Sequence, residues 1–212
     1  LMIPQGNKRF FEIISSNAEK TLKIKKITKS VTGGKLKFTG YYDNLDNDNI
    51  FDANLTLKDF AIKKKSKLAG FIKVIRIFDI KQQLKGDTED FEYAIMEVKK
   101  RNKIFEIVNG KAYGGLMALN IDGMIDKNNN TVELKGMVAP IHEIDNWVSK
   151  IPIFGDILTG SDGTGSVVAA NYSVTGTIKK PKYFVNPLSV LTPGIFKDFW
   201  KIFDIQKKST TN

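Results

Sequence analysis

The feature that most constrains this chain is an alternation of apolar and polar residues with a period of two, repeated in separate runs. The run 35–42 places apolar or small residues at even positions, and the run 51–58 places them at odd positions. Successive side chains of a strand point to opposite faces, so each run predicts a β-strand with one apolar face. The same pattern predicts further strands at 91–98, 103–108, 115–125, 131–138, 165–178 and 182–185.

Turn-forming residues separate several of these runs. Asp43-Asn44 begins one such segment, Val108-Asn109-Gly110-Lys111 has the Asn-Gly pair typical of a two-residue hairpin, and residues 126–130 read Asp-Lys-Asn-Asn-Asn. A parallel crossover needs a dozen residues or more. Strands joined by segments this short are therefore predicted to be antiparallel.

Four segments show apolar residues spaced by three and four, which is typical of amphipathic helices: 17–27, 66–78, 140–150 and 193–205. In the first, Ala18 and Leu22 lie on one side, with Ile24 and Ile27 as further candidates for that side. The predicted fold class is mainly β with a few α-helices: a twisted antiparallel sheet with short helices laid on it.

The size and composition fit one globular domain. The chain has 212 residues, of which 42% are hydrophobic and 26% charged. A chain of this size can bury enough surface to fold without disulfide bonds or a bound metal. We assign residues 1–205 to a single domain and 206–212 to a disordered tail. The absence of cysteine excludes thiolate zinc sites, iron–sulfur clusters and cysteine nucleophiles.

The basic residues are almost all lysine. The net charge is +10, and of the 33 basic residues only Arg9, Arg76 and Arg101 are arginine. A dedicated nucleic-acid binder would favour arginine for its bidentate and stacking contacts. We therefore predict no specific nucleic-acid partner and favour adhesion to an anionic lipid surface, with nonspecific polyanion binding by the first half as a further alternative.

No motif predicts catalysis, a metal site or a cofactor. The glycine-rich segment 159–165 lacks the Lys-Ser/Thr ending of a phosphate-binding loop, and no Gly-x-Ser-x-Gly sequence is present. His142 has no patterned nucleophile partner, and 43–48 lacks the glycine and closing glutamate of a calcium loop. We predict that the protein is not an enzyme and has no catalytic residues, metal or cofactor.

An alternating sheet must cover its apolar face. The few short helices supply limited covering surface, so a long-chain lipid is one candidate filler and a closed barrel or sandwich packed with side chains is the other. Each apolar strand residue left uncovered forfeits about 1.5–3 kcal/mol, so a bare apolar face is not expected.

Several motifs, in order along the chain, resemble a known family. Residues 165–182 contain A-x-Y-x-V-x-G followed by a proline, and 185–196 read VNPLSVLTPGIF. Residues 151–160, IPIFGDILTG, precede them. Motifs of the same family that come earlier in its sequence match residues 55–60, 67–69, 115–125 and 132–140. This set, spanning roughly 30–204, resembles the AsmA-like C-terminal domain family of YhdP/TamB/AsmA-type envelope proteins, relatives of bridge-like lipid-transfer proteins.

The resemblance implies an antiparallel twisted sheet curled into a hydrophobic trough and capped by short amphipathic helices. It also implies a non-enzymatic segment at the distal end of a longer protein that carries or shields phospholipid acyl chains between inner and outer membranes. The expected location is the periplasm or cell envelope of a Gram-negative bacterium, with inner-membrane anchoring in the full-length family. Expected partners are phospholipid, a membrane surface and other envelope proteins.

The resemblance carries over no catalytic residues, but it makes the alternating apolar positions candidates for the lining of a lipid groove, with ordinary core packing as the alternative. Those positions are Leu36, Phe38, Leu55, Leu57, Met117, Leu119, Ile121, Val132, Leu134, Tyr172 and Val174. The last predicted helix forms a candidate membrane anchor or lid through Phe196, Phe199, Trp200 and Phe203. The alternative function is a tip that docks on a membrane or partner without transporting lipid.

Overall fold

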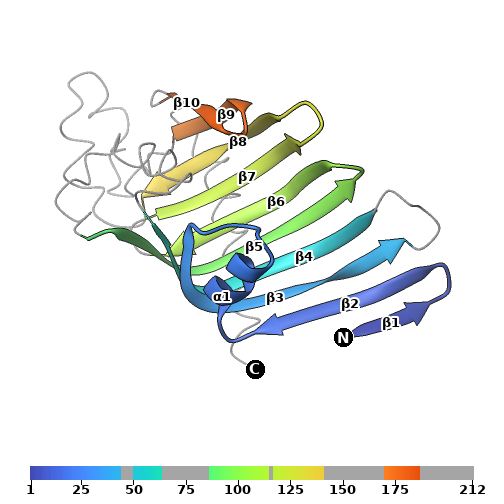
Figure 1. Ribbon diagram of the computed structural model, residues 1–212. Helices are drawn as coiled ribbons and strands as arrows, with labels where there is room; N and C mark the ends of the chain where they lie inside the picture. Colours follow the sequence, from blue (N-terminus) through green and yellow to red (C-terminus); the bar gives the residue numbers. More distant parts are fainter. Residues whose placement is uncertain (44–49, 64–85, 115–116, 141–169, 187–212) are drawn as a thin grey trace, which may run out of the picture.

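A computed structural model describes residues 1–43, 50–63, 86–114, 117–140 and 170–186. These residues form one antiparallel sheet of ten strands in which every strand pairs with its neighbours in the sequence, and one helix (Figure 1). The prediction of a mainly β fold is confirmed. The elements are β1 (Met2–Gln5), β2 (Lys8–Ser15), α1 (Ala18–Ile24), β3 (Val31–Asp43), β4 (Phe51–Lys63), β5 (Thr88–Arg101), β6 (Ile104–Gly114), β7 (Met117–Asp126), β8 (Thr131–Pro140), β9 (Ala170–Thr177) and β10 (Lys180–Asn186).

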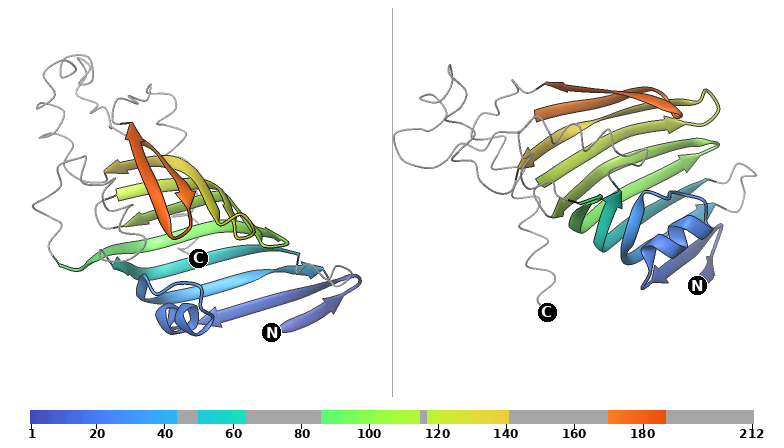
Figure 2. Two further views of the ribbon diagram at one scale, coloured as in Figure 1. Left: turned by 45° about the horizontal axis from the view of Figure 1, so that its top comes forward. Right: turned by 60° about the vertical axis from the view of Figure 1, so that its left-hand side comes forward.

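The sheet is twisted and curved, and α1 lies on one of its faces (Figure 2). Helix α1 begins after Asn17, whose Oδ1 accepts a hydrogen bond from the Lys20 backbone N–H at 2.8 Å. Its buried residues, Ala18 and Leu22, belong to the same apolar cluster as the central strands. The face that carries α1 is therefore the apolar face of the sheet.

Strands β1 and β2 were not predicted. Neighbouring apolar residues in β2, such as Ile13 and Ile14, interrupt the alternation that marks the other strands. In the structure Ile13 packs against the apolar cluster while Ile14 is 68% exposed on the other face. Period two fails here because both faces of β2 carry large apolar side chains.

The hairpin turn predicted at 108–111 is wrong, since this segment lies inside β6. The pairing of β6 shifts register there with both neighbours, which marks a β-bulge. Asn109 has φ 52°, and its backbone N–H donates to Asp122 Oδ1 at 2.7 Å while its side-chain amide donates to Glu97 Oε1 at 3.2 Å. A left-handed asparagine suits a bulge as well as a hairpin turn, so the sequence alone did not separate them.

The turn predicted at 126–130 is confirmed between β7 and β8. Asp126 Oδ1 accepts hydrogen bonds from the backbone N–H groups of Asn128 at 2.7 Å and Asn129 at 3.1 Å. Hydrogen bonds from Asn129 and Asn128 to this carboxylate hold the pKa of Asp126 below its ordinary value. Asn130 closes the turn with φ 54°.

Of the predicted helices, the first is observed, but it is shorter than 17–27 because it ends at Ile24. The helix predicted at 140–150 is wrong at its first residue, since Pro140 ends β8 and pairs with Met117. The rest of that segment and the helices predicted at 66–78 and 193–205 lie outside the described residues.

A row of unusual backbone conformations crosses four strands near one end of the sheet. The strand registers align Gly34, Asp59, Glu92 and Gly114 side by side on β3 to β6. Three of them have positive φ: 81° for Gly34, 53° for Asp59 and 143° for Gly114. We call these four residues the irregular row; the register of β3, β4 and β5 continues past it with no extra residue, so it is not a β-bulge.

The irregular row changes which residues face the core. On β4, Leu57 and Phe60 are both buried in the apolar cluster although they are three residues apart, and on β5 the same holds for Phe91 and Ala94. In an uninterrupted strand, residues three apart point to opposite faces. The row therefore resets the alternation, so that both ends of these strands contribute to one apolar face.

We expect Gly114→Ala to destabilise the protein by about 2–5 kcal/mol, because it combines a strained backbone with steric overlap. An added Cβ would lie 2.2 Å from the Glu92 backbone nitrogen and 2.6 Å from Phe91 Cα. Gly176→Ala is the matched control: φ is 99° there, but the nearest atom to an added Cβ is 3.6 Å away. Chemical denaturation measures both, and equal losses would contradict the role of the irregular row.

Candidate functional site

The apolar side chains of the sheet and α1 form one continuous cluster. All eleven residues predicted to line a groove belong to it, either as buried members or as partly buried side chains packed against them. The buried ones are Leu36, Leu57, Met117, Val132, Leu134, Tyr172 and Val174, and the partly buried ones are Phe38, Leu55, Leu119 and Ile121. The alternation thus places all of these residues on one face.

The cluster is not completely filled. A cavity of about 290 Å³ lies among α1, the segment that follows α1, and strands β3 to β9. Seven of the eleven predicted groove residues line it: Leu55, Leu57, Met117, Leu119, Ile121, Leu134 and Tyr172. The remaining four, Leu36, Phe38, Val132 and Val174, are not among its lining residues and pack in the surrounding cluster.

Other lining residues were not predicted as groove positions. Met96, Ile107 and Ala112 line the cavity from β5 and β6, close to the bulge at Asn109. The extra residue of a bulge breaks the period-two pattern, which hides these positions in the sequence. Leu22 and Ile27, from α1 and the segment after it, complete one wall.

Tyr172 supplies the clearest polar anchor in the wall. It is buried, and its hydroxyl donates a hydrogen bond to the Asn120 backbone oxygen at 2.6 Å. Burial of the ring raises the pKa of the Tyr172 hydroxyl far above its ordinary value, with a further contribution from the charge of Asp122. The hydroxyl therefore stays neutral, and its polar end is directed to the backbone of β7.

Gly136 makes room for this contact. It pairs directly with Tyr172 across β8 and β9, and an added Cβ would lie 2.8 Å from the tyrosine hydroxyl oxygen. On the next strand, the Asn120 side-chain oxygen accepts a hydrogen bond from the Met137 N–H at 2.5 Å. The wall at β7 to β9 is thus held by polar contacts while the surface it turns to the cavity remains apolar.

Few of the cavity's lining residues are polar. Glu89, which is 5% exposed, is the acidic residue in the lining, and Lys111 and Thr28 are its other polar members. Across the described ranges, no group of three His, Cys, Asp or Glu residues could hold a metal ion. The cavity can accept an apolar ligand by contact.

Several predicted features lie outside the described residues. They include the candidate membrane or lid residues Phe196, Phe199, Trp200 and Phe203, together with His142 and the glycine-rich segment 159–165. Within the described part of the chain, no helix has the length and hydropathy needed to cross a membrane.

Comparison with known proteins returned no match: no family model matches the chain, and neither a curated protein nor a solved structure is similar to it. The resemblance to the AsmA-like C-terminal domain therefore stays a prediction that rests on the motifs quoted above.

We expect Tyr172→Phe to lower the free energy of unfolding by about 1 kcal/mol at neutral pH, because it removes the hydrogen bond to Asn120. The two proteins should also differ in alkaline solution. The folded state raises the pKa of Tyr172 above its unfolded value, so its stabilising contribution is complete below about pH 10 and is lost above it, at about 1.4 kcal/mol per pH unit.

Denaturant titrations between neutral pH and about pH 11 test this expectation. The wild type should lose stability more steeply than Tyr172→Phe above about pH 10, so that the difference between them shrinks. Parallel curves would show that Tyr172 is ionised equally easily in both states, against its observed burial.

Proposed function

We propose that this protein binds the acyl chain of a lipid in the cavity between α1 and the sheet, without chemical turnover. The observation that carries the proposal is a cavity of about 290 Å³ lined almost entirely by apolar side chains. Apolar cavities in proteins take up apolar ligands. The volume lies near the lower end of the range of about 300–1,000 Å³ found for ligand pockets.

The shape of the lining favours a long, unbranched ligand. Lining residues come from seven consecutive strands, β3 to β9, so the cavity extends across the strands. Each methylene group moved from water into such a site contributes about 0.8 kcal/mol. A chain of about eight methylenes would therefore gain about 6 kcal/mol, which is enough to offset part of the cost of association.

The wider proposal is that the sheet is a segment of a trough that carries or shields phospholipid acyl chains in a bacterial envelope. Its support is the resemblance, whose motifs at 55–60, 115–125, 132–140 and 165–182 overlap β4, β7, β8 and β9. These four strands supply Leu57, Leu119, Leu134 and Tyr172 to the cavity. The positions that carry the resemblance are thus also positions that would contact the lipid.

Ala112→Phe should weaken the binding of a fluorescent long-chain fatty acid by about tenfold or more, because the added ring displaces at least two methylenes. Ala112 lines the cavity from β6. Asn54→Phe is the matched control, since it adds the same ring at an exposed position on the opposite face of β4. Fluorescence titration of the full chain, with circular dichroism as a folding check, measures both variants.

Native mass spectrometry of protein purified from a lipid-containing host gives a second test. Bound phospholipid should be present in the wild type and in Asn54→Phe and depleted in Ala112→Phe. Equal fatty-acid affinity in all three proteins, or wild-type protein that never retains lipid, would overturn the proposal and leave the docking tip as the better function.

A further inference from the structure

The segment from the middle of α1 to the start of β3 combines exposed apolar and basic side chains. Residues 23–27 are all exposed, and Ile24 and Ile27 are each 66% exposed. We define the α1 patch as these two isoleucines and the lysines around them: Lys20, Lys23, Ile24, Lys25, Lys26, Ile27 and Lys29.

The exposure of the two isoleucines corrects the sequence-based interpretation, which made them candidates for the covered side of the helix. Only Ala18 and Leu22 of α1 are buried. The helix ends at Ile24, which lies about 200° around the helix from Leu22 and therefore on the side away from the sheet. Ile24 and Ile27 therefore both remain exposed.

The backbone holds Ile27 in a fixed place. Lys26 has φ 55°, its N–H donates to the Lys23 oxygen at 3.1 Å, and the Ile27 N–H donates to the Leu22 oxygen at 2.9 Å. This pair of hydrogen bonds is a Schellman motif, which ends a helix and brings its last apolar residues together. Because Leu22 and Ile27 both line the cavity, the α1 patch borders the cavity directly.

The five lysines of the patch have one acidic residue close to them in the sequence. Glu19 is the acidic residue of this segment, and its carboxylate is already engaged by the Gly33 backbone N–H at 3.1 Å and by Lys63 Nζ at 3.4 Å. The hydrogen bond from Gly33, followed by that from Lys63, lowers the pKa of Glu19. None of the five patch lysines forms an ion pair with any residue that the structure describes.

We propose that the α1 patch docks the protein on a membrane surface rich in anionic phospholipid. The lysines would lie among the phosphate groups while Ile24 and Ile27 enter the interface, as in other basic, apolar interfacial segments. Docking in this way would bring the cavity wall formed by Leu22 and Ile27 against the lipid. The purpose of the docking, though not the docking itself, rests on the proposed acyl-chain binding.

Three properties of the patch favour a lipid surface over a nucleic acid. All its basic residues are lysine, it has no aromatic side chain on which a base could stack, and it exposes two aliphatic side chains. Single-stranded nucleic acid is bound largely by stacking on aromatic rings, and base recognition favours arginine. Aliphatic side chains interleaved with lysine suit a headgroup layer above acyl chains.

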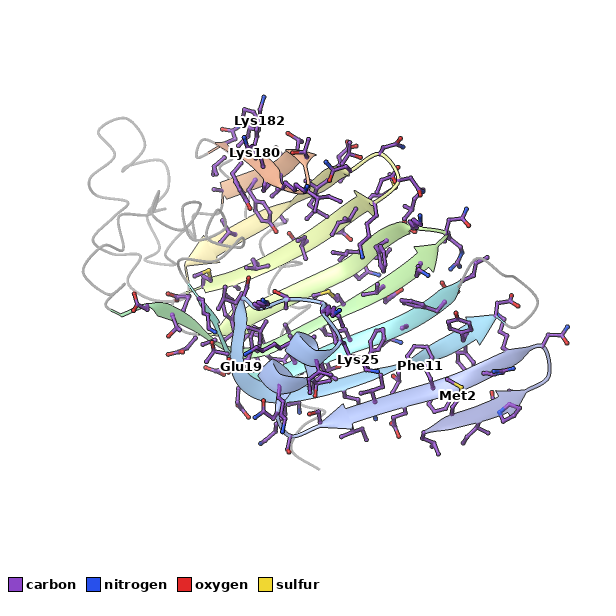
Figure 3. All side chains as sticks on the ribbon, viewed as in Figure 1. Met2, Phe11, Glu19, Lys25, Lys180 and Lys182 are labelled. Carbon is purple, nitrogen blue, oxygen red and sulfur yellow. The ribbon has the colours of Figure 1, made fainter. Side chains whose placement is uncertain are left out.

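A second group of exposed lysines provides a matched control. Lys179, Lys180 and Lys182 lie at the β9–β10 hairpin, and none of them lines the cavity. Figure 3 shows Lys180 and Lys182 far from α1. Replacing three lysines by glutamine in either group removes the same charge from the protein. A difference between the two variants therefore reports position and not net charge.

Flotation of the full chain with vesicles of phosphatidylcholine and phosphatidylglycerol, compared with pure phosphatidylcholine, tests the proposal. The triple variant Lys20→Gln, Lys23→Gln, Lys25→Gln should lower the partition coefficient for the anionic vesicles by about 100-fold at low salt. Ile24→Ser, which removes no charge, should lower it by about tenfold. The variant with Lys179, Lys180 and Lys182 changed to glutamine should stay within a few-fold of the wild type, and high salt should weaken all binding.

Equal losses in the two triple variants, or no effect of Ile24→Ser, would overturn the assignment to the α1 patch. So would a wild type that binds a fluorescent single-stranded oligonucleotide through the patch but no anionic vesicle. The free fatty-acid titration without vesicles keeps the two proposals apart. Intact fatty-acid binding with lost flotation in the α1 triple variant supports the docking surface, and lost fatty-acid binding with intact flotation overturns only the proposed function.

Discussion

The structure depends on keeping the apolar side chains of ten successive strands on one face of a single sheet. A register slip of one residue would move all the apolar side chains of a strand to the other face of the sheet. A twisted and curved sheet also contains bulges, and each bulge adds a residue that shifts the alternation. The irregular row at Gly34, Asp59, Glu92 and Gly114, which resets the alternation without an extra residue, and the bulge at Asn109 occur where this conflict is resolved. Beyond each of them the apolar residues return to the same face.

The cavity follows from the same constraint. A curved sheet brings the side chains of distant strands toward one another on its apolar face, but it does not by itself fill the space between them. Small residues in the wall, such as Ala94 and Ala112, leave room that larger ones would occupy. Tyr172, in contrast, closes the wall at β9 through its bond to the β7 backbone, which holds one boundary of the space while its centre stays open.

Alternation and turn chemistry predicted the fold class, the antiparallel pairing and the strands from β3 to β10, because these depend on local pattern. They also placed the eleven groove candidates on one face. They failed at β2, where Ile13 and Ile14 are both apolar, and at Asn109, where one backbone conformation serves a turn and a bulge. Only some of the eleven residues line the cavity, because this depends on the curvature of the sheet across several strands. Local sequence patterns do not predict that curvature.

The isoleucines after α1 show how a failed prediction can locate a surface. At about 100° per residue, Ile24 lies about 200° around the helix from Leu22 and so points away from the buried side, while Ile27 follows the Schellman motif that ends the helix; both remain exposed. Leu22, which precedes this turn, is buried and lines the cavity. The packing of Leu22 therefore fixes the turn that leaves Ile24 and Ile27 exposed. The proposed lipid layer at the patch would lie against the wall that Leu22 and Ile27 form, so an acyl chain from that layer would start next to the cavity.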